Sequence, residues 1–158
     1  RLYWHKFSQI NLEPFGVCEF HILANEGNIP HFHITNDNID ISFCLYSPEY
    51  YNTGTRISDD NLRTIYDHLQ SYICLTNLIH IRATHWSYLC RLWKFANPNE
   101  DYNEKHEWPK TIPNYTLANS IYDQYGPVMY DASKDPNYRD DIVIGKIDFS
   151  KIDGSVHE

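Results

Sequence analysis

Hydrophobic and polar residues alternate along several short stretches in the first part of the chain, which is typical of strands with one buried face. The clearest stretches are residues 17–24 and 30–35, separated by Asn25-Glu26-Gly27-Asn28, whose Asn and Gly residues tolerate left-handed backbone. This pattern predicts a β-hairpin. Further strands are expected over residues 2–7, ended by a turn at residues 11–14, and over residues 39–46.

One register of the hairpin separates its side chains cleanly, because pairing Ile22 with Phe32 gathers the apolar residues on one face. That face, which we expect to be buried, holds Phe20, Ile22, Phe32 and Ile34. The opposite face then holds four polar residues within cross-strand reach, namely Glu19, His21, His31 and His33.

The pattern changes to helical spacing after residue 58. Ser58 is a suitable N-cap, and apolar residues recur every three to four positions as far as Ile73, which predicts a helix over residues 59–73. Thr84 is the next suitable N-cap, for a helix that ends at Asn97-Pro98. The apolar face of this second helix holds Trp86, Leu89, Cys90 and Trp93. Residues 74–81 fit a helix extension, a strand or a buried connection.

This order of elements predicts an α+β fold, with a small antiparallel sheet followed by two helices and an extended C-terminal arm. Residues 1–97 would form the core domain. Residues 98–158 are acidic and rich in Pro, Asn and Tyr, and only residues 142–149 resemble a strand. Because aromatic side chains favour burial, we expect this arm to pack on the core or on a partner, either another protein or a second copy of the chain.

Charge and cysteine spacing narrow the classes of function. The 158 residues carry a formal net charge of −8, which disfavours general binding to nucleic acid. No apolar run is long enough to span a membrane, and the start of the chain lacks a signal-peptide pattern. The four cysteines form no Cys-x-x-Cys pair and have apolar neighbours, which favours buried free thiols. A cytoplasmic protein is therefore expected.

The polar face of the hairpin supports two interpretations. Three imidazoles and a carboxylate, from His21, His31, His33 and Glu19, suit a divalent transition metal such as zinc, iron, manganese or nickel. An open coordination position on that metal would allow hydrolytic or oxygen chemistry. The alternative is an ordinary solvated face that happens to carry histidines. The sequence leaves open whether the site is catalytic.

Two triplets suggest a different chemistry. His33-Ile34-Thr35 and His85-Trp86-Ser87 resemble the paired motifs of the 2H phosphoesterases, which cleave RNA ends or cyclic nucleotides. The resemblance implies that His33 and His85 act as base and acid, with Thr35 and Ser87 holding the phosphate. In that family both motifs lie on strands, whereas His85 is expected to open a helix.

A second resemblance covers residues 20–98. Ile29-Pro30-His31-Phe32-His33-Ile34 is similar to the Pro-Pro-His-Phe-His-Val motif of a small bacterial and phage family of unknown function. The first proline of that motif is Ile29 here, and the arm after Pro98 has no counterpart. The resemblance implies a short sheet followed by helices, and an accessory role in regulation, toxicity or host interaction, in the host cytosol if the chain is phage-encoded. It implies no reaction.

Two functional hypotheses follow. The first is an accessory protein of bacterial or phage origin with a histidine-centred site on its sheet. The second is a non-catalytic binding or structural subunit that docks a partner through its C-terminal arm. The 2H-type phosphoesterase is a further alternative.

Overall fold

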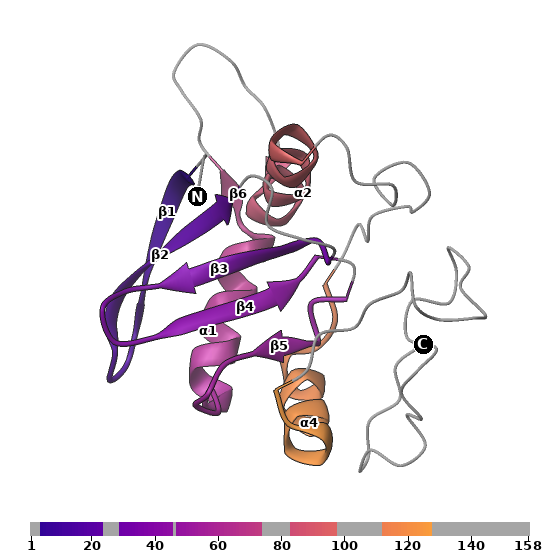
Figure 1. Ribbon diagram of the computed structural model, residues 1–158. Coiled ribbons are helices and arrows are strands. Elements are labelled where there is room, and N and C mark those ends of the chain that lie inside the picture. The colour runs from indigo at the N-terminus through magenta and orange to yellow at the C-terminus, as the bar shows by residue number, and fades with distance from the viewer. Residues whose placement is uncertain (1–3, 24–28, 46, 74–82, 98–111, 128–158) are drawn as a thin grey trace, which may run out of the picture.

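The computed structural model describes residues 4–23, 29–45, 47–73, 83–97 and 112–127. Five strands form one antiparallel sheet in chain order: β1 (Trp4–Leu12), β2 (Gly16–Leu23), β3 (His31–Thr35), β4 (Asp40–Cys44) and β5 (Tyr51–Asn52). Among the described residues three helices follow: α1 (Asp59–Gln70), α2 (His85–Ala96) and α4 (Tyr115–Tyr125). Two short strands, β6 (Tyr72–Ile73) and β7 (Ala83–Thr84), pair with each other beside the ends of α1 and α2 (Figure 1). The predicted α+β class is confirmed.

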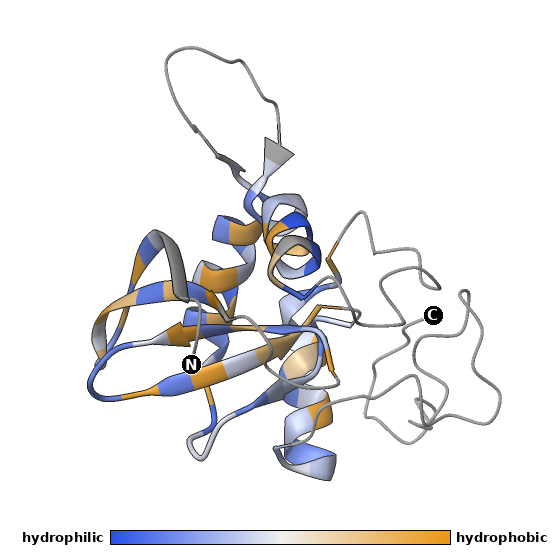
Figure 2. Cartoon of the chain, turned by 45° about the horizontal axis from the view of Figure 1, so that its top comes forward, coloured by the Kyte–Doolittle hydropathy of each residue, from blue (hydrophilic) through white to orange (hydrophobic). Residues whose placement is uncertain are grey.

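The predicted hairpin and its register are confirmed. β2 pairs with β3 through Glu19 and Thr35, Phe20 and Ile34, and His21 and His33. Hydrophobic and hydrophilic residues alternate along these strands (Figure 2). The apolar face predicted from the register is buried in one core with both helices; this set comprises Phe20, Ile22, Phe32, Ile34, Trp86, Leu89 and Trp93.

Strand β1 is longer than predicted. It continues to Leu12, and the chain reverses through residues 13–15 into β2. The pairing register shifts between Lys6 and Ser8, so the alternation changes phase in the middle of the strand. Beyond the shift, Ile10 and Leu12 are buried in the core while Asn11 is exposed. Because of this change of phase, the alternating pattern in the sequence ends before the strand does, and the predicted strand is too short.

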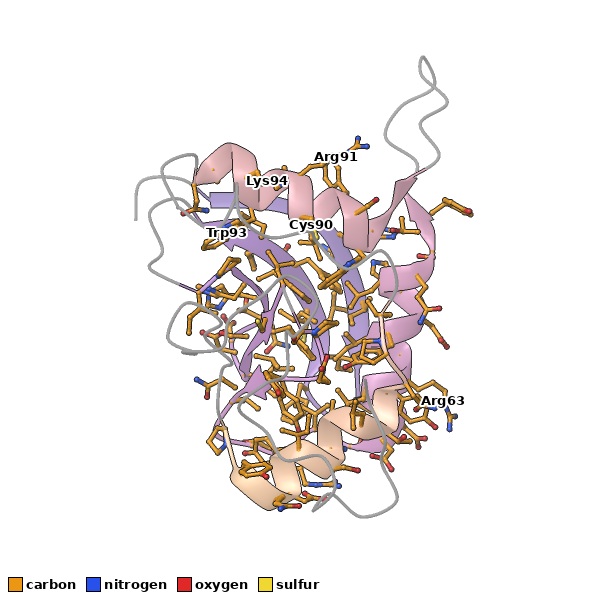
Figure 3. The ribbon with its side chains drawn as sticks, turned by 90° about the vertical axis from the view of Figure 1, so that its right-hand side faces the viewer. Arg63, Cys90, Arg91, Trp93 and Lys94 are labelled. Carbon is orange, nitrogen blue, oxygen red and sulfur yellow. The ribbon has the colours of Figure 1, made fainter. Side chains whose placement is uncertain are left out.

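Both helix starts were predicted correctly. The side chain of Ser58 accepts a hydrogen bond from the Asn61 N–H, and that of Thr84 accepts one from the Ser87 N–H. Helix α2 ends at Asn97 as expected, whereas α1 ends at Gln70 and the residues after Ser71 form β6. Figure 3 shows Cys90 and Trp93 on the sheet side of α2, where both are buried. Arg91 lies on the outer side and is exposed.

The C-terminal arm is not wholly extended, because residues 115–125 form helix α4. Asn114 caps it, and its buried face holds Leu117, Ala118, Asn119 and Ile121. The helix packs against α1, and the ring of Tyr122 stacks on Tyr51 with 4.8 Å between centroids. At least this part of the arm therefore packs on the sheet and helices of its own chain. The predicted strand over residues 142–149 and the ambiguous residues 74–81 lie outside the described residues.

The cysteine prediction is confirmed for three of the four residues. Cys18, Cys44 and Cys90 are buried free thiols, and Cys74 lies outside the described residues. In the part of the chain that the structure describes, no helix has both the length and the apolar character to cross a membrane.

Candidate functional site

The polar side of the sheet, opposite the face that packs on α1 and α2, carries the predicted site. We call it the histidine face and define it by seven residues of β2, β3 and β4: Glu19, His21, His31, His33, Thr35, Asp40 and Ser42. This face is partly exposed to solvent: Asp40 is exposed, whereas His21 and His33 are buried. His21 is 2% exposed and His33 is 9% exposed. A buried imidazole has to be held by specific partners, and the structure shows several of them.

His33 is fixed in one orientation by strand β4. Its Nδ1 lies 3.0 Å from Asp40 Oδ1 and 3.2 Å from Ser42 Oγ. A carboxylate only accepts hydrogen bonds, so the contact with Asp40 places a proton on Nδ1, and in the neutral ring of this tautomer the lone pair lies on Nε2. That Nε2 atom is buried and has no hydrogen-bond partner among the described residues.

His31 is oriented in the same way. Its Nδ1 lies 2.6 Å from the carbonyl oxygen of Ile29, which again places the proton on Nδ1. The rings of His31 and His33 lie edge to face, 4.9 Å apart between centroids. His31 is the first residue of β3, and at this end of the strand its ring lies 5.5 Å from the indole of Trp93 of α2, measured between centroids, although His33 further along the strand does not contact this helix in the same way. The structure therefore gives two adjacent imidazoles with the same tautomer.

Glu19 and His21 form a separate pair. His21 Nε2 lies 3.8 Å from Glu19 Oε1, and Gln9 Nε2 donates to Glu19 Oε2 at 3.4 Å. Among the described residues, no group of three or more His, Cys, Asp or Glu side chains is arranged to hold a metal ion. The four ligands predicted from the sequence are thus not gathered around one point. They form the pair Glu19–His21 and the pair His31–His33.

The two triplets of the 2H-type hypothesis lie on opposite sides of the sheet. The ring of Phe32 contacts Trp86 of α2, so His33, the next residue of β3, points away from that helix. His85 packs on His68, which in turn stacks on Phe20 within the core face. His33 and His85 therefore share no surface, and this correction removes the geometric basis of a common phosphate site.

Sequence reasoning missed a histidine cluster on the core side. His68 of α1 is part-buried, and its Nε2 lies 2.5 Å from Ser8 Oγ. Its ring lies 4.1 Å from that of His85, whose Nδ1 is within 3.1 Å of Ser71 Oγ and 3.0 Å of Ser71 O. Burial, and secondly the neighbouring His85, lower the pKa of His68 to about 4.

This cluster predicts a loss of stability in acid. Because the pKa of His68 falls from 6.5 in the unfolded chain to about 4 in the fold, the unfolded chain binds more protons between these values. The stabilisation is present above pH 6.5 and is lost as the pH falls to about 4. Because solvent screens the half-buried ring, we expect this part of the unfolding free energy to be about 1–2 kcal/mol.

Urea unfolding of the full chain and of His68→Gln at several pH values measures this effect. Glutamine stays neutral, so the difference in unfolding free energy between the two proteins should change across pH 4 to 6.5. Two curves that stay parallel over this range would contradict the prediction.

Comparison with family models, with curated proteins and with solved structures gave no match for this chain. The functional argument therefore rests on the site itself.

Proposed function

We propose that this chain is an accessory protein whose histidine face binds a divalent transition metal through His31 and His33. One observation carries the proposal: both imidazoles have Nδ1 anchored, by the Ile29 carbonyl and by the Asp40 carboxylate. Histidines that bind metals through Nε2 usually donate their Nδ1–H to a carbonyl or carboxylate, which fixes the ring and makes it a better ligand. A bacterial or phage origin and a cytoplasmic location belong to the same proposal.

The electrostatic setting supports a cation at this position. Asp40 contributes a negative charge behind His33, and the whole chain carries a formal −8. Neutral imidazoles suit zinc, copper, iron and nickel. Two protein ligands leave coordination positions for water or for a further ligand, which is compatible with either a binding or a chemical role.

Metal binding is tested by titrating Zn²⁺ and Co²⁺ into protein purified without a histidine tag and stripped of metal. We expect a stoichiometry of one ion, and for Co²⁺ the visible absorption of a nitrogen-ligated site. His31→Ala and His33→Ala should each weaken binding strongly. Asp40→Asn, which keeps the size of the side chain but removes its charge, should weaken binding by about 10- to 100-fold.

His21→Ala is the matched control, because it removes an imidazole from the same face outside the His31–His33 pair. Unchanged affinity in this variant supports the pair, and a loss equal to that of His33→Ala would restore the four-ligand site predicted from the sequence. If neither metal binds above the level of the His31→Ala variant, the proposal fails.

The alternative is a non-catalytic subunit that docks another protein or a second copy of the chain through residues 98–158. In the described part of this arm, α4 uses one face to pack on α1 and Tyr51. A docking surface on α4 would therefore have to use its exposed side, which carries Thr116, Asp123, Gln124 and Tyr125.

A further inference from the structure

Trp93 of α2 carries a buried polar atom that lacks a hydrogen-bond partner, as His33 does on the neighbouring strand. Its side chain is fully buried, and its indole Nε1–H meets no acceptor among the described residues. A buried N–H group without an acceptor costs free energy, so native proteins usually satisfy it with a protein group, a water molecule or a ligand. The indole therefore calls for an acceptor from outside the described part of the chain.

The indole lies at the same end of the sheet as the metal pair. Its ring centroid is 5.5 Å from that of His31, and the His31 ring is 4.9 Å from that of His33. Figure 3 shows Trp93 on the sheet side of α2. His31 thus has an unsatisfied donor in one neighbour, Trp93 Nε1–H, and an unsatisfied atom in the other, His33 Nε2. Because the indole is small and rigid, its N–H lies within the length of a small ligand from the His31 ring.

These two groups together fit one class of ligand. A metal ion on the imidazoles satisfies His33 Nε2 but not the indole, because an N–H group donates only to an acceptor. A carboxylate binds such an ion through one oxygen and accepts a hydrogen bond through the other. The positive charge of the ion favours this anionic ligand. The burial of Trp93 and His33 restricts the ligand to a small one.

We propose that the metal ion held by His31 and His33 takes a small carboxylate as a further ligand, and that Trp93 Nε1–H donates to the second oxygen of that carboxylate. The inference rests on the proposed function, because the ion must be present. Trp93 then distinguishes an oxyanion, which offers the second oxygen, from a ligand that only fills the coordination position. Bound water is the competing ligand, and the experiment separates the two.

The test is an NMR titration of the Zn²⁺-loaded full chain with acetate, observing the indole N–H signals of its four tryptophans. The signal of Trp93 is assigned through its contacts with the His31 ring protons, so the test does not require a variant to fold. We expect this signal to move downfield as acetate binds. Acetamide, which has the same shape without the charge, should leave it in place. Acetate should also leave it in place when EDTA has removed the ion.

Trp93→Phe removes the N–H group and keeps an aromatic ring. In the Co²⁺-loaded protein, followed by visible absorption, it should weaken acetate binding by about tenfold or more, with the affinity for Co²⁺ unchanged. Trp86→Phe is the matched control, because it removes another buried indole of α2, one that contacts Phe32. This variant should bind acetate as the unaltered chain does. Equal losses in the two variants would overturn the role of Trp93.

The two proposals can fail separately. If neither Zn²⁺ nor Co²⁺ binds, the metal proposal fails and this inference fails with it. If both ions bind, but acetate changes neither the Trp93 signal nor the Co²⁺ absorption, only this inference fails, and the ion holds water alone. Movement of the Trp93 signal by acetate in EDTA would likewise contradict a carboxylate held by the ion.

A short peptide with a blocked N-terminus and a free C-terminal carboxylate distinguishes the two sources of such a ligand. Because the surrounding rings are buried, we expect acetate to bind more tightly than the peptide. Tighter binding of acetate assigns the site to a small free acid. Tighter binding of the peptide would overturn that assignment in favour of a protein terminus.

Discussion

Replacing Phe32 by alanine is expected to lower the free energy of unfolding by about 3–5 kcal/mol. Its side chain is fully buried at the centre of the sheet, where it stacks on Phe20 and Phe43 with ring centroids 6.0 and 5.4 Å away. Trp86 of α2 contacts the same ring edge to face at 6.3 Å. Alanine would leave a cavity that three rigid aromatic rings from separate elements fill only in part.

Urea unfolding followed by tryptophan fluorescence measures this loss, since Trp86 lies beside the new cavity. Phe32→Leu keeps most of the volume and should cost less than about 1.5 kcal/mol. Val17→Ala truncates a side chain of β2 that is 57% exposed and should change stability by less than about 1 kcal/mol. A loss of under about 1 kcal/mol in Phe32→Ala would show that the core tolerates the cavity by collapsing.

The register of β2 and β3 was predictable because a period of two leaves little choice. Shifting the pairing by one residue would move the apolar residues of one strand, either Phe20 and Ile22 or Phe32 and Ile34, to the polar face, so burial of all four excludes that shift. The helix starts were predictable for a local reason, since the side chains of Ser58 and Thr84 satisfy backbone N–H groups within the next three residues. Such features need no knowledge of distant contacts.

Features that depend on distant partners could not be predicted in the same way. Helix α4 is short and follows a proline-rich stretch, and its buried Asn119 interrupts the apolar pattern. That residue is explained only by partners more than fifty positions earlier in the chain. Likewise, the proximity of Ser8 to His68 depends on β1 lying under the end of α1.

The candidate site could be predicted from the sequence only in part. The sequence predicted that His31 and His33 share a face, and the structure confirms it. It missed Asp40 and Ser42, although both alternate with the buried residues Ile41 and Phe43 along β4. Extending the hairpin register to this third strand would have placed them beside His33. The separation of Glu19 and His21 from the other pair depends on side-chain orientation, which strand alternation does not determine.

Replacing Asn119 by alanine is expected to cost about 2–4 kcal/mol, because its side chain joins α4 to the rest of the fold in a buried network. Asn119 Oδ1 accepts from Tyr51 Oη at 2.6 Å, and its Nδ2 donates to the Ile57 carbonyl and to Asp59 Oδ1, both at 2.7 Å. The backbone N–H of Ile57 also donates to Tyr51 Oη, at 3.2 Å. Removing the amide would leave the Tyr51 hydroxyl and the Ile57 carbonyl without this partner in a buried place.

The matched control on the same helix is Asp123→Ala. Asp123 forms a bidentate ion pair with Arg56, at 2.6 and 2.9 Å, and that partner lowers the pKa of the carboxyl. Both side chains are exposed, so the pair should contribute at most about 1 kcal/mol. Chemical unfolding of both variants separates the buried network from the surface pair.

The same comparison bears on what the C-terminal arm does. A large loss in Asn119→Ala, with one cooperative transition, means that α4 is part of the core and that its buried face is committed to the fold. A loss no greater than that of Asp123→Ala would mean that α4 contributes little to folding. At small free-energy cost, such a weakly held helix would leave its own core and pack on another protein. The better functional hypothesis would then be a subunit that docks a partner through its C-terminal arm.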